Sequence, residues 1–137
     1  MDQGFNTNPH LAYIELWGVM QAIFLQQDSI TTLYKIFMED KLSLENESKW
    51  KEIRKLRNQC SGHPLDQSGK YRSFFGRDGI NYENLRYERK DRRLPEPEFI
   101  TIDYAQLISD YADETIPFLD AIIETMTKRW PITEQKA

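Results

Sequence analysis

The chain has little of the chemistry that small proteins use for cross-linking or for metal binding. Its 137 residues include one cysteine, Cys60, and two histidines, His10 and His63. A single cysteine excludes an internal disulfide framework and a cysteine-based zinc site, and it is compatible with a reducing cytoplasm. A metal site would have to rest mainly on carboxylates. We therefore expect a cytoplasmic protein that needs no metal and no cofactor.

Long hydrophobic runs are also absent. The longest mostly apolar stretch, from Leu11 to Leu25, is too short to cross a bilayer and contains Glu15 and Gln21. No positively charged region precedes it, so it does not have the pattern of a signal peptide. Charged residues make up 29% of the chain and hydrophobic residues 39%, which is typical of a globular protein. We expect one domain over residues 1–137.

The net charge of −4 conceals a strong segregation of charge along the chain. Residues 1–48 carry a net −5 and residues 94–137 a net −6, whereas residues 49–93 carry thirteen basic and six acidic side chains, a net +7. One interpretation is a solvated basic segment between two acidic ends. The other is a surface for a polyanion, because phosphate contacts depend on local positive charge rather than on overall pI.

A first helix is predicted over residues 9–27. Asn8 is a good N-cap and Pro9 suits the first helical position. Apolar residues then occur on nearly every side of the helix, so it needs partners on several faces. Two interpretations remain open: part of the helix faces a second subunit, or it is the central helix of a monomer.

Three further helices follow from capping residues and from apolar spacing. Asp28-Ser29 predicts a helix over 29–40, Ser48 one over 49–62, and Asp103 one over 104–129.

Residues 65–100 differ from the helical segments. Tyr71 to Phe75 and Ile80 to Tyr87 have the pattern of a hairpin with a four-residue loop from Gly76 to Gly79. Residues 99–102 predict a further short extended piece. The expected fold is therefore mainly α: an up-and-down four-helix bundle with a small β-hairpin insertion between the third and fourth helices.

The third predicted helix carries an arginine on its packed side. On a wheel of 100° per residue, Arg57 falls within the arc that Trp50, Ile53 and Leu56 define as buried. A buried guanidinium is costly unless it is paired. Two explanations stay open: an internal carboxylate such as Glu15 or Asp28 neutralises Arg57 in a structural salt bridge, or Arg57 lines an anion-binding cleft.

A histidine follows this arginine closely. Five residues separate Arg57 from His63, which lies just past the predicted helix end and before Pro64. A lone histidine in such a place is usually a capping or surface residue. The combination is more informative, because the neutral-range pKa of histidine suits acid–base chemistry and arginine suits the charge on a phosphoryl group.

This segment resembles the signature of the HEPN-domain superfamily, in which an arginine, often followed by asparagine, precedes a histidine by four to six residues. Here the matching text is Ile53-Arg54-Lys55-Leu56-Arg57-Asn58 followed by Gly62-His63-Pro64. Gln26-Gln27-Asp28 is similar to a bacterial branch of that superfamily. The resemblance covers about residues 10–125, and it implies a helical bundle with the motif at a helix end.

The resemblance also implies an activity, a metal-independent endoribonuclease of toxin or phage-defence type. His63 would act as general acid or base, Arg57 would hold the scissile phosphate, and Asn58 would orient the substrate or the His63 ring. The expected products are a 2′,3′-cyclic phosphate and a 5′-hydroxyl. Further phosphate contacts are expected from basic residues near the motif, namely Arg54, Lys70, Arg72 and Arg77.

The histidine count favours a homodimer. Cleavage of this kind benefits from one base and one acid, yet His63 is the only suitable histidine in each chain. A two-fold interface that brings two motifs together would supply both groups. The partners expected are thus a second copy, RNA as substrate, and an antitoxin or other protein. A second hypothesis is a non-catalytic HEPN-like module that dimerises and binds a nucleotide or a protein, which the overall acidity favours.

Overall fold

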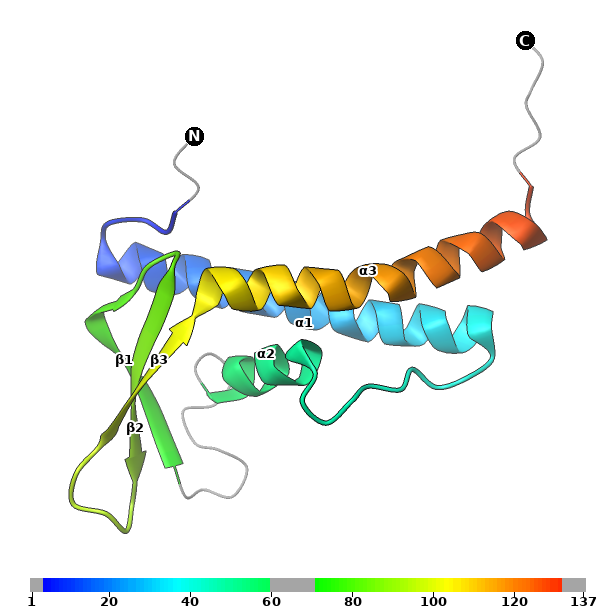
Figure 1. Cartoon of the computed structure of the whole chain (residues 1–137). Coiled ribbons are helices and arrows are strands. Elements are labelled where there is room, and N and C mark those ends of the chain that lie inside the picture. The colour runs from blue at the N-terminus through cyan, green and yellow to red at the C-terminus, as the bar shows by residue number, and fades with distance from the viewer. Residues whose placement is uncertain (1–3, 60–70, 132–137) are drawn as a thin grey trace.

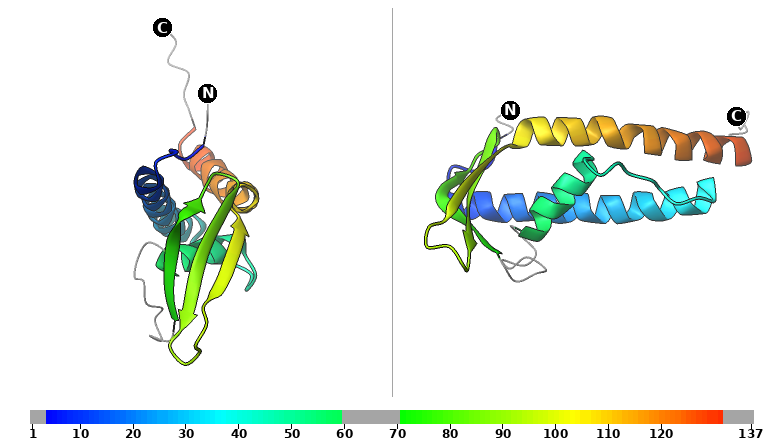
Figure 2. Two further views of the ribbon diagram at one scale, coloured as in Figure 1. Left: turned by 90° about the vertical axis from the view of Figure 1, so that its left-hand side faces the viewer. Right: turned by 60° about the horizontal axis from the view of Figure 1, so that its bottom comes forward.

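The computed structural model describes residues 4–59 and 71–131, except for the side chains of Arg77 and Asp78. In this part of the chain, three helices and one antiparallel three-stranded sheet follow in the order α1 (Pro9–Met38), α2 (Lys49–Arg57), β1 (Tyr71–Ile80), β2 (Asn84–Asp91), β3 (Glu98–Asp103) and α3 (Tyr104–Arg129). Figure 1 shows α1 and α3 side by side and running in the same direction. The short α2 packs beneath this pair, and the sheet lies across one end of it (Figure 2).

The prediction of two helices over 9–27 and 29–40 is wrong, because α1 is continuous through both. The Ser29 hydroxyl, which with Asp28 suggested a new helix start, is bonded inside the helix instead, as is the hydroxyl of Thr32. Ser29 Oγ donates to the Leu25 carbonyl at 2.8 Å, and Thr32 Oγ1 donates to the Asp28 carbonyl at 2.9 Å. Such bonds to the carbonyl four residues back let a cap-forming residue sit within a helix.

The predicted up-and-down four-helix bundle is also wrong, and the described fold is an α+β arrangement. Merging the first two predicted helices removes one member of the bundle. The expected hairpin also gains a third strand, because β3 pairs along β2 from Asn84↔Asp103 to Arg89↔Glu98. The chain returns through this sheet before α3 begins, so α3 runs parallel to α1 rather than up and down against it (Figure 1).

The hairpin itself is present, with its turn in a different place. Strand β1 continues through Gly76 to Ile80, and its register against β2 shifts between the pairs Phe75↔Tyr87 and Ile80↔Leu85. The turn lies at residues 81–83, where the Asn81 side chain accepts hydrogen bonds from two backbone N–H groups. Both glycines therefore lie within an irregularity of the strand pairing and not in the turn.

The three N-caps that begin the described helices are confirmed. The side chain of Asn8 accepts from the His10 N–H, and the side chains of Ser48 and Asp103 do the same for Lys51 and Gln106. Each cap satisfies one of the backbone donors that a helix start leaves without an internal partner.

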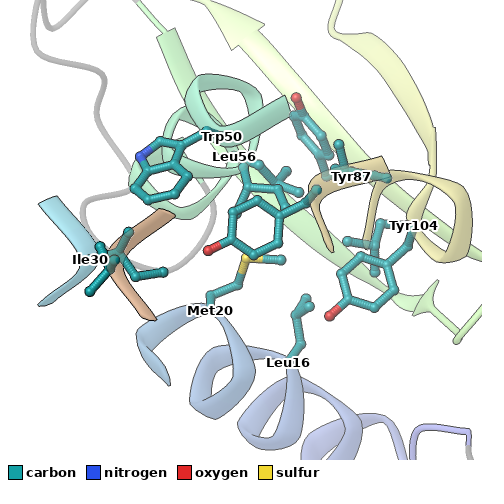
Figure 3. Packing of buried hydrophobic residues seen from close by; sticks show 12 residues of the cluster. Leu16, Met20, Ile30, Trp50, Leu56, Tyr87 and Tyr104 are labelled. Atoms are coloured by element: carbon teal, nitrogen blue, oxygen red, sulfur yellow. The ribbon is translucent and has the colours of Figure 1, made fainter. Parts of the chain in front are cut away.

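The hydrophobic core lies where the three helices and the sheet meet. Figure 3 shows side chains from every layer turned into it: Leu16, Met20 and Ile30 from α1, Trp50 and Leu56 from α2, Tyr87 from β2 and Tyr104 from α3.

Trp50 joins α2 to both long helices. Its ring packs against Tyr111 and Phe118 of α3, with centroid distances of 5.8 and 6.1 Å. The backbone carbonyl of Trp50 accepts a hydrogen bond from the fully buried Gln27 side chain of α1, and the backbone N–H of Trp50 donates to the Glu114 carboxylate of α3. In the first turn of α2, side chains of the two long helices thus bond one backbone N–H and one backbone carbonyl, and Glu114 places a negative charge at the helix start.

Helix α1 is not buried all round. One side packs on α2, α3 and β1, while large apolar residues elsewhere on the helix are exposed, among them Leu11, Ile14, Leu25 and Ile36. In the described part of the chain, no helix combines the length and the apolar character that crossing a membrane requires.

Gly79 and Gly76 provide a matched test of the irregular strand pairing. A Cβ atom at Gly79 would collide with the backbone carbonyl of Arg86, whereas a Cβ atom at Gly76 meets nothing within 4 Å. We expect Gly79→Ala to lower the free energy of unfolding by about 1–3 kcal/mol, and Gly76→Ala to change it by less than about 0.5 kcal/mol. Urea titration followed by circular dichroism measures both, and equal effects of the two substitutions would contradict this account.

Candidate functional site at the end of α2

The last turn of α2 brings Arg57 against α1. Arg57 is half-buried, as the helical wheel predicts. Its Nη1 donates to Asn58 Oδ1 at 2.9 Å, and its Nη2 donates to Gln21 Oε1 at 3.0 Å. The guanidinium also lies over the ring of Phe24, 4.2 Å from the centroid. Two polar contacts and one ring therefore fix the plane and the direction of the guanidinium group.

Arg54 shares the same ring. One helical turn before Arg57, its guanidinium lies 4.1 Å from the Phe24 centroid and donates to Asp28 Oδ1 at 2.9 Å. Two cations attracted by one aromatic ring form a local concentration of positive charge. We call Gln21, Phe24, Arg54, Arg57 and Asn58 the arginine cluster.

The carboxylates that the sequence suggested as internal partners for Arg57 are engaged elsewhere. Asp28 forms its ion pair with Arg54, and Glu15 accepts a hydrogen bond from the Asn6 backbone at 2.7 Å. Glu15 and Asp28 thus do not provide the structural salt bridge that was one of the two explanations for Arg57.

The backbone of α2 changes from α-helical to π-helical geometry at the end that carries the arginine cluster. Asn58 and Gln59 continue α2 in π-helical geometry, which is rare and occurs often at functional sites. Gln59 Oε1 accepts a hydrogen bond from the Tyr87 hydroxyl of β2 at 3.3 Å. The end of α2 is thereby tied to the inner face of the sheet as well as to α1.

The structure brings only part of the predicted site together. Arg54, Arg57 and Asn58 lie in one cluster. Arg72 is exposed on β1, where it pairs across the strands with Lys90, away from the cluster. The backbone of Arg77 belongs to β1 but its side chain is not described, and His63 and Lys70 lie outside the described residues.

Gln21 and Phe24 belong to the site but were not predicted from the sequence. Both lie on α1, more than thirty residues before Arg57, and contact it only because α2 folds back across that helix. One signal was available, since Gln21 and Glu15 are polar residues within a mostly apolar stretch. Nothing in the local sequence marks Phe24 as different from the core aromatics.

A second concavity lies elsewhere, between α1 and α3. This groove of about 560 Å³ is lined mainly by apolar side chains, including Phe5, Val19 and Tyr104. Burial raises the pKa of Tyr104 to about 12. Val19 and Gln21 point in directions roughly 160° apart on α1, so the groove and the arginine cluster lie on opposite sides of that helix.

The described residues contain no group of three or more histidine, cysteine, aspartate or glutamate side chains that could hold a metal ion. Comparison of the chain with protein-family models, with curated proteins and with solved structures finds no match.

The balance of charge in the arginine cluster can be tested with inorganic phosphate. Asp28→Asn removes the carboxylate beside Arg54, so we expect phosphate to bind up to about fivefold more tightly, the size of an exposed ion-pair contribution. Arg57→Gln should weaken binding. The measurement is the rise in Tm with phosphate at constant ionic strength, with Asp113→Asn on exposed α3 surface as the control. A smaller rise for Asp28→Asn than for the unaltered chain would contradict the assignment.

Proposed function

We propose that the chain is a metal-independent endoribonuclease of toxin or phage-defence type, with a composite site at a homodimer interface. The observation that carries the proposal is the arginine cluster itself. Two guanidinium groups share one ring at the end of α2, and His63 follows Arg57 within six residues of sequence. Negative charge develops on a phosphoryl group in the transition state, and cations that are already held in position stabilise it.

In the proposed reaction, the ribose 2′-oxygen attacks the adjacent phosphorus while the bond from phosphorus to the 5′-oxygen breaks. His63 of one subunit removes the proton from the 2′-hydroxyl, and His63 of the partner subunit gives a proton to the leaving 5′-oxygen. The products are a 2′,3′-cyclic phosphate and a 5′-hydroxyl. Arg57 stabilises the charge on the phosphoryl oxygens. Asn58 accepts a hydrogen bond from Arg57 and so acts as a positioning residue for it.

A stripe on α1 is the surface that we propose for dimerisation. Six exposed residues fall within an arc of about 60° along the whole helix, and none of them is charged. They are Leu11, Gly18, Ala22, Leu25, Ser29 and Ile36, and exposed Ile14, Glu15, Thr32 and Leu33 flank the arc. We call the six residues within the arc the α1 stripe. Apolar surface of this extent on a helix about 45 Å long is more typical of an obligate interface than of a solvated face.

The small residues of the α1 stripe favour close contact between two helices near its middle. Gly18 has nothing within 4 Å of the position where a Cβ atom would stand, and Ala22 follows one turn later. If two copies of α1 cross there, Gln21 of each subunit lies beside the two-fold axis. Because Gln21 holds Arg57, this crossing would bring the two arginine clusters together.

The second candidate function is a non-catalytic HEPN-like module that dimerises and binds a nucleotide or a protein. A specific observation favours it: the contacts of Arg57 with Gln21 and Phe24 also join α2 to α1, so Arg57 has a structural role regardless of any reaction. Substitution of Arg57 would then affect stability without affecting any chemistry.

Cleavage of single-stranded RNA in the presence of EDTA tests the nuclease. We expect the unaltered chain to leave 2′,3′-cyclic phosphate and 5′-hydroxyl ends, and His63→Ala to slow cleavage by about 100-fold or more, the usual contribution of a general acid or base. His10→Ala is the matched control, because His10 is exposed in the first turn of α1 and should keep full activity. Equal cleavage by the unaltered chain and His63→Ala, or no cleavage of several different RNAs, would exclude the nuclease in favour of the second candidate.

The dimer interface is tested by introducing a charge into the α1 stripe. Leu25 is 65% exposed, so Leu25→Glu should leave the fold intact, produce a monomer in light scattering, and reduce RNA cleavage by about tenfold or more through the loss of the second histidine. Ile123→Glu is the control, since Ile123 is 58% exposed on α3, and it should remain dimeric. A fully active Leu25→Glu monomer would contradict the composite site, and a monomer from Ile123→Glu alone would place the interface on α3.

A further inference from the structure

One face of the sheet points away from the helices. Residues of β1 and β2 alternate between the core and solvent: Ser73, Leu85 and Tyr87 are buried, whereas Phe74 and Arg86 are exposed. The view in the left panel of Figure 2 looks at the sheet from the side opposite the helices. We call the residues of this side the outer sheet face: Arg72, Phe74, Arg86, Glu88, Lys90 and Phe99.

Two phenylalanines occupy equivalent positions on the two edge strands. Phe74 of β1 and Phe99 of β3 both pair with Glu88 of the central strand. Two strand spacings separate them, which is about 10 Å. Phe74 is 48% exposed and Phe99 is 60% exposed. Exposed aromatic side chains that lie on one face of a sheet and are surrounded by polar residues are typical of a binding surface.

The charges around these rings are mostly positive. The outer sheet face has three cations, Arg72, Arg86 and Lys90, and one carboxylate, Glu88. Arg72 and Lys90 pair directly across the strands, an arrangement of like charges that is unfavourable without an anion. Neither side chain forms a hydrogen bond or an ion pair with any residue that the structure describes.

Arg86 connects the charges to the aromatic rings. Its guanidinium lies 5.2 Å from the centroid of Phe99. Arginine planes and aromatic rings are the two kinds of side chain on which unpaired bases stack. This corner of the sheet therefore offers a base both a ring and a fixed cation.

We propose that the outer sheet face binds single-stranded RNA. Bases stack on Phe74 and Phe99, and Arg72, Arg86 and Lys90 hold phosphates. Sheet surfaces with exposed aromatic residues and a basic rim bind single strands in this way, because every base has a face that can stack. The choice of RNA over DNA rests on the proposed function, whereas the stacking and charge arguments are independent of it.

Glu88 adds a base preference to this surface. Its carboxylate lies between the two rings in the strand register, and a carboxylate accepts hydrogen bonds from an exocyclic amino group such as that of cytosine. Uracil has no such group. The outer sheet face should therefore bind cytosine-rich strands more tightly than uracil-rich strands.

Direct binding measurements test this inference. The full chain with His63→Ala, which should cut RNA at least about 100-fold more slowly, is titrated into fluorescently labelled RNA of about 12 nucleotides and followed by anisotropy. We expect Phe74→Leu and Phe99→Leu each to weaken binding about tenfold, because they keep apolar bulk but lose the stacking face. Phe99→Trp keeps a stacking face and should bind RNA at least as tightly as the chain with Phe99. Trp130→Leu, at an exposed aromatic position just after α3, is the matched control and should change nothing.

Salt dependence tests the phosphate contacts separately. The plot of log binding constant against log salt concentration should become shallower by about 1.4 when Arg72 and Lys90 are both changed to glutamine, since each contact to a single strand contributes about 0.7. Lys35→Gln with Lys41→Gln, far from the sheet, should leave the slope unchanged. Glu88→Gln should reduce the preference for cytosine-rich over uracil-rich RNA.

The outcomes separate this inference from the nuclease. RNA binding that depends on Phe74 and Phe99 in a chain that never cuts RNA would support the outer sheet face and exclude the nuclease. Cleavage together with binding that ignores both phenylalanines would support the nuclease and overturn the inference. Complete absence of RNA binding would overturn it too. If the phenylalanine variants change self-association or protein binding and leave RNA binding unaltered, the face belongs to a protein interface and the inference is wrong.

Discussion

Trp50 determines where α2 lies, and the arginine cluster depends on that position. The ring packs against α3 while the backbone of the same residue is bonded to Gln27 on α1 and to Glu114 on α3. Gln27 is fully buried, so losing its bond to Trp50 would leave a polar group without compensation inside the core. A nine-residue helix is too short to be stable by itself. Its position must come from contacts of this kind, and seven residues after Trp50 those contacts deliver Arg57 onto Phe24.

This arrangement gives the arginine cluster two properties. The guanidinium of Arg57 is held by an amide on each side and by a ring, so it needs little reorganisation to meet an anion. The cluster also lies beside the α1 stripe, which is apolar and exposed. If two copies of the chain associate through the α1 stripe, water leaves the surface beside Arg54 and Arg57. The local dielectric constant would then fall, and the interaction of the two arginines with a phosphate would become stronger.

Local signals in the sequence predicted the parts of the fold that local chemistry controls. Asn8, Ser48 and Asp103 begin helices where expected, because capping depends on neighbouring backbone groups. Asp28-Ser29 failed for a related reason: the same hydroxyl chemistry that caps a helix can bond back into one. The number of long helices, the third strand and the parallel course of α1 and α3 depend on contacts between distant segments. The contacts of Arg57 with Phe24 and Gln21 also join distant segments. The helical wheel therefore predicted that Arg57 lies on a packed side, but it did not predict which residues Arg57 contacts.

Strand β2 connects the two proposed surfaces. Tyr87 faces inward and its hydroxyl donates to Gln59 beside the arginine cluster, whereas its neighbours Arg86 and Glu88 belong to the outer sheet face. Because side chains alternate along a strand, a slip of one residue would exchange these roles completely. The register is fixed on one side by the pairing with β3 and on the other by the irregularity before Ile80, where Gly79 allows the Arg86 carbonyl to approach closely. The position of β2 therefore sets both surfaces at once, because residues of the outer sheet face are the immediate neighbours of Tyr87, which is bonded beside the arginine cluster.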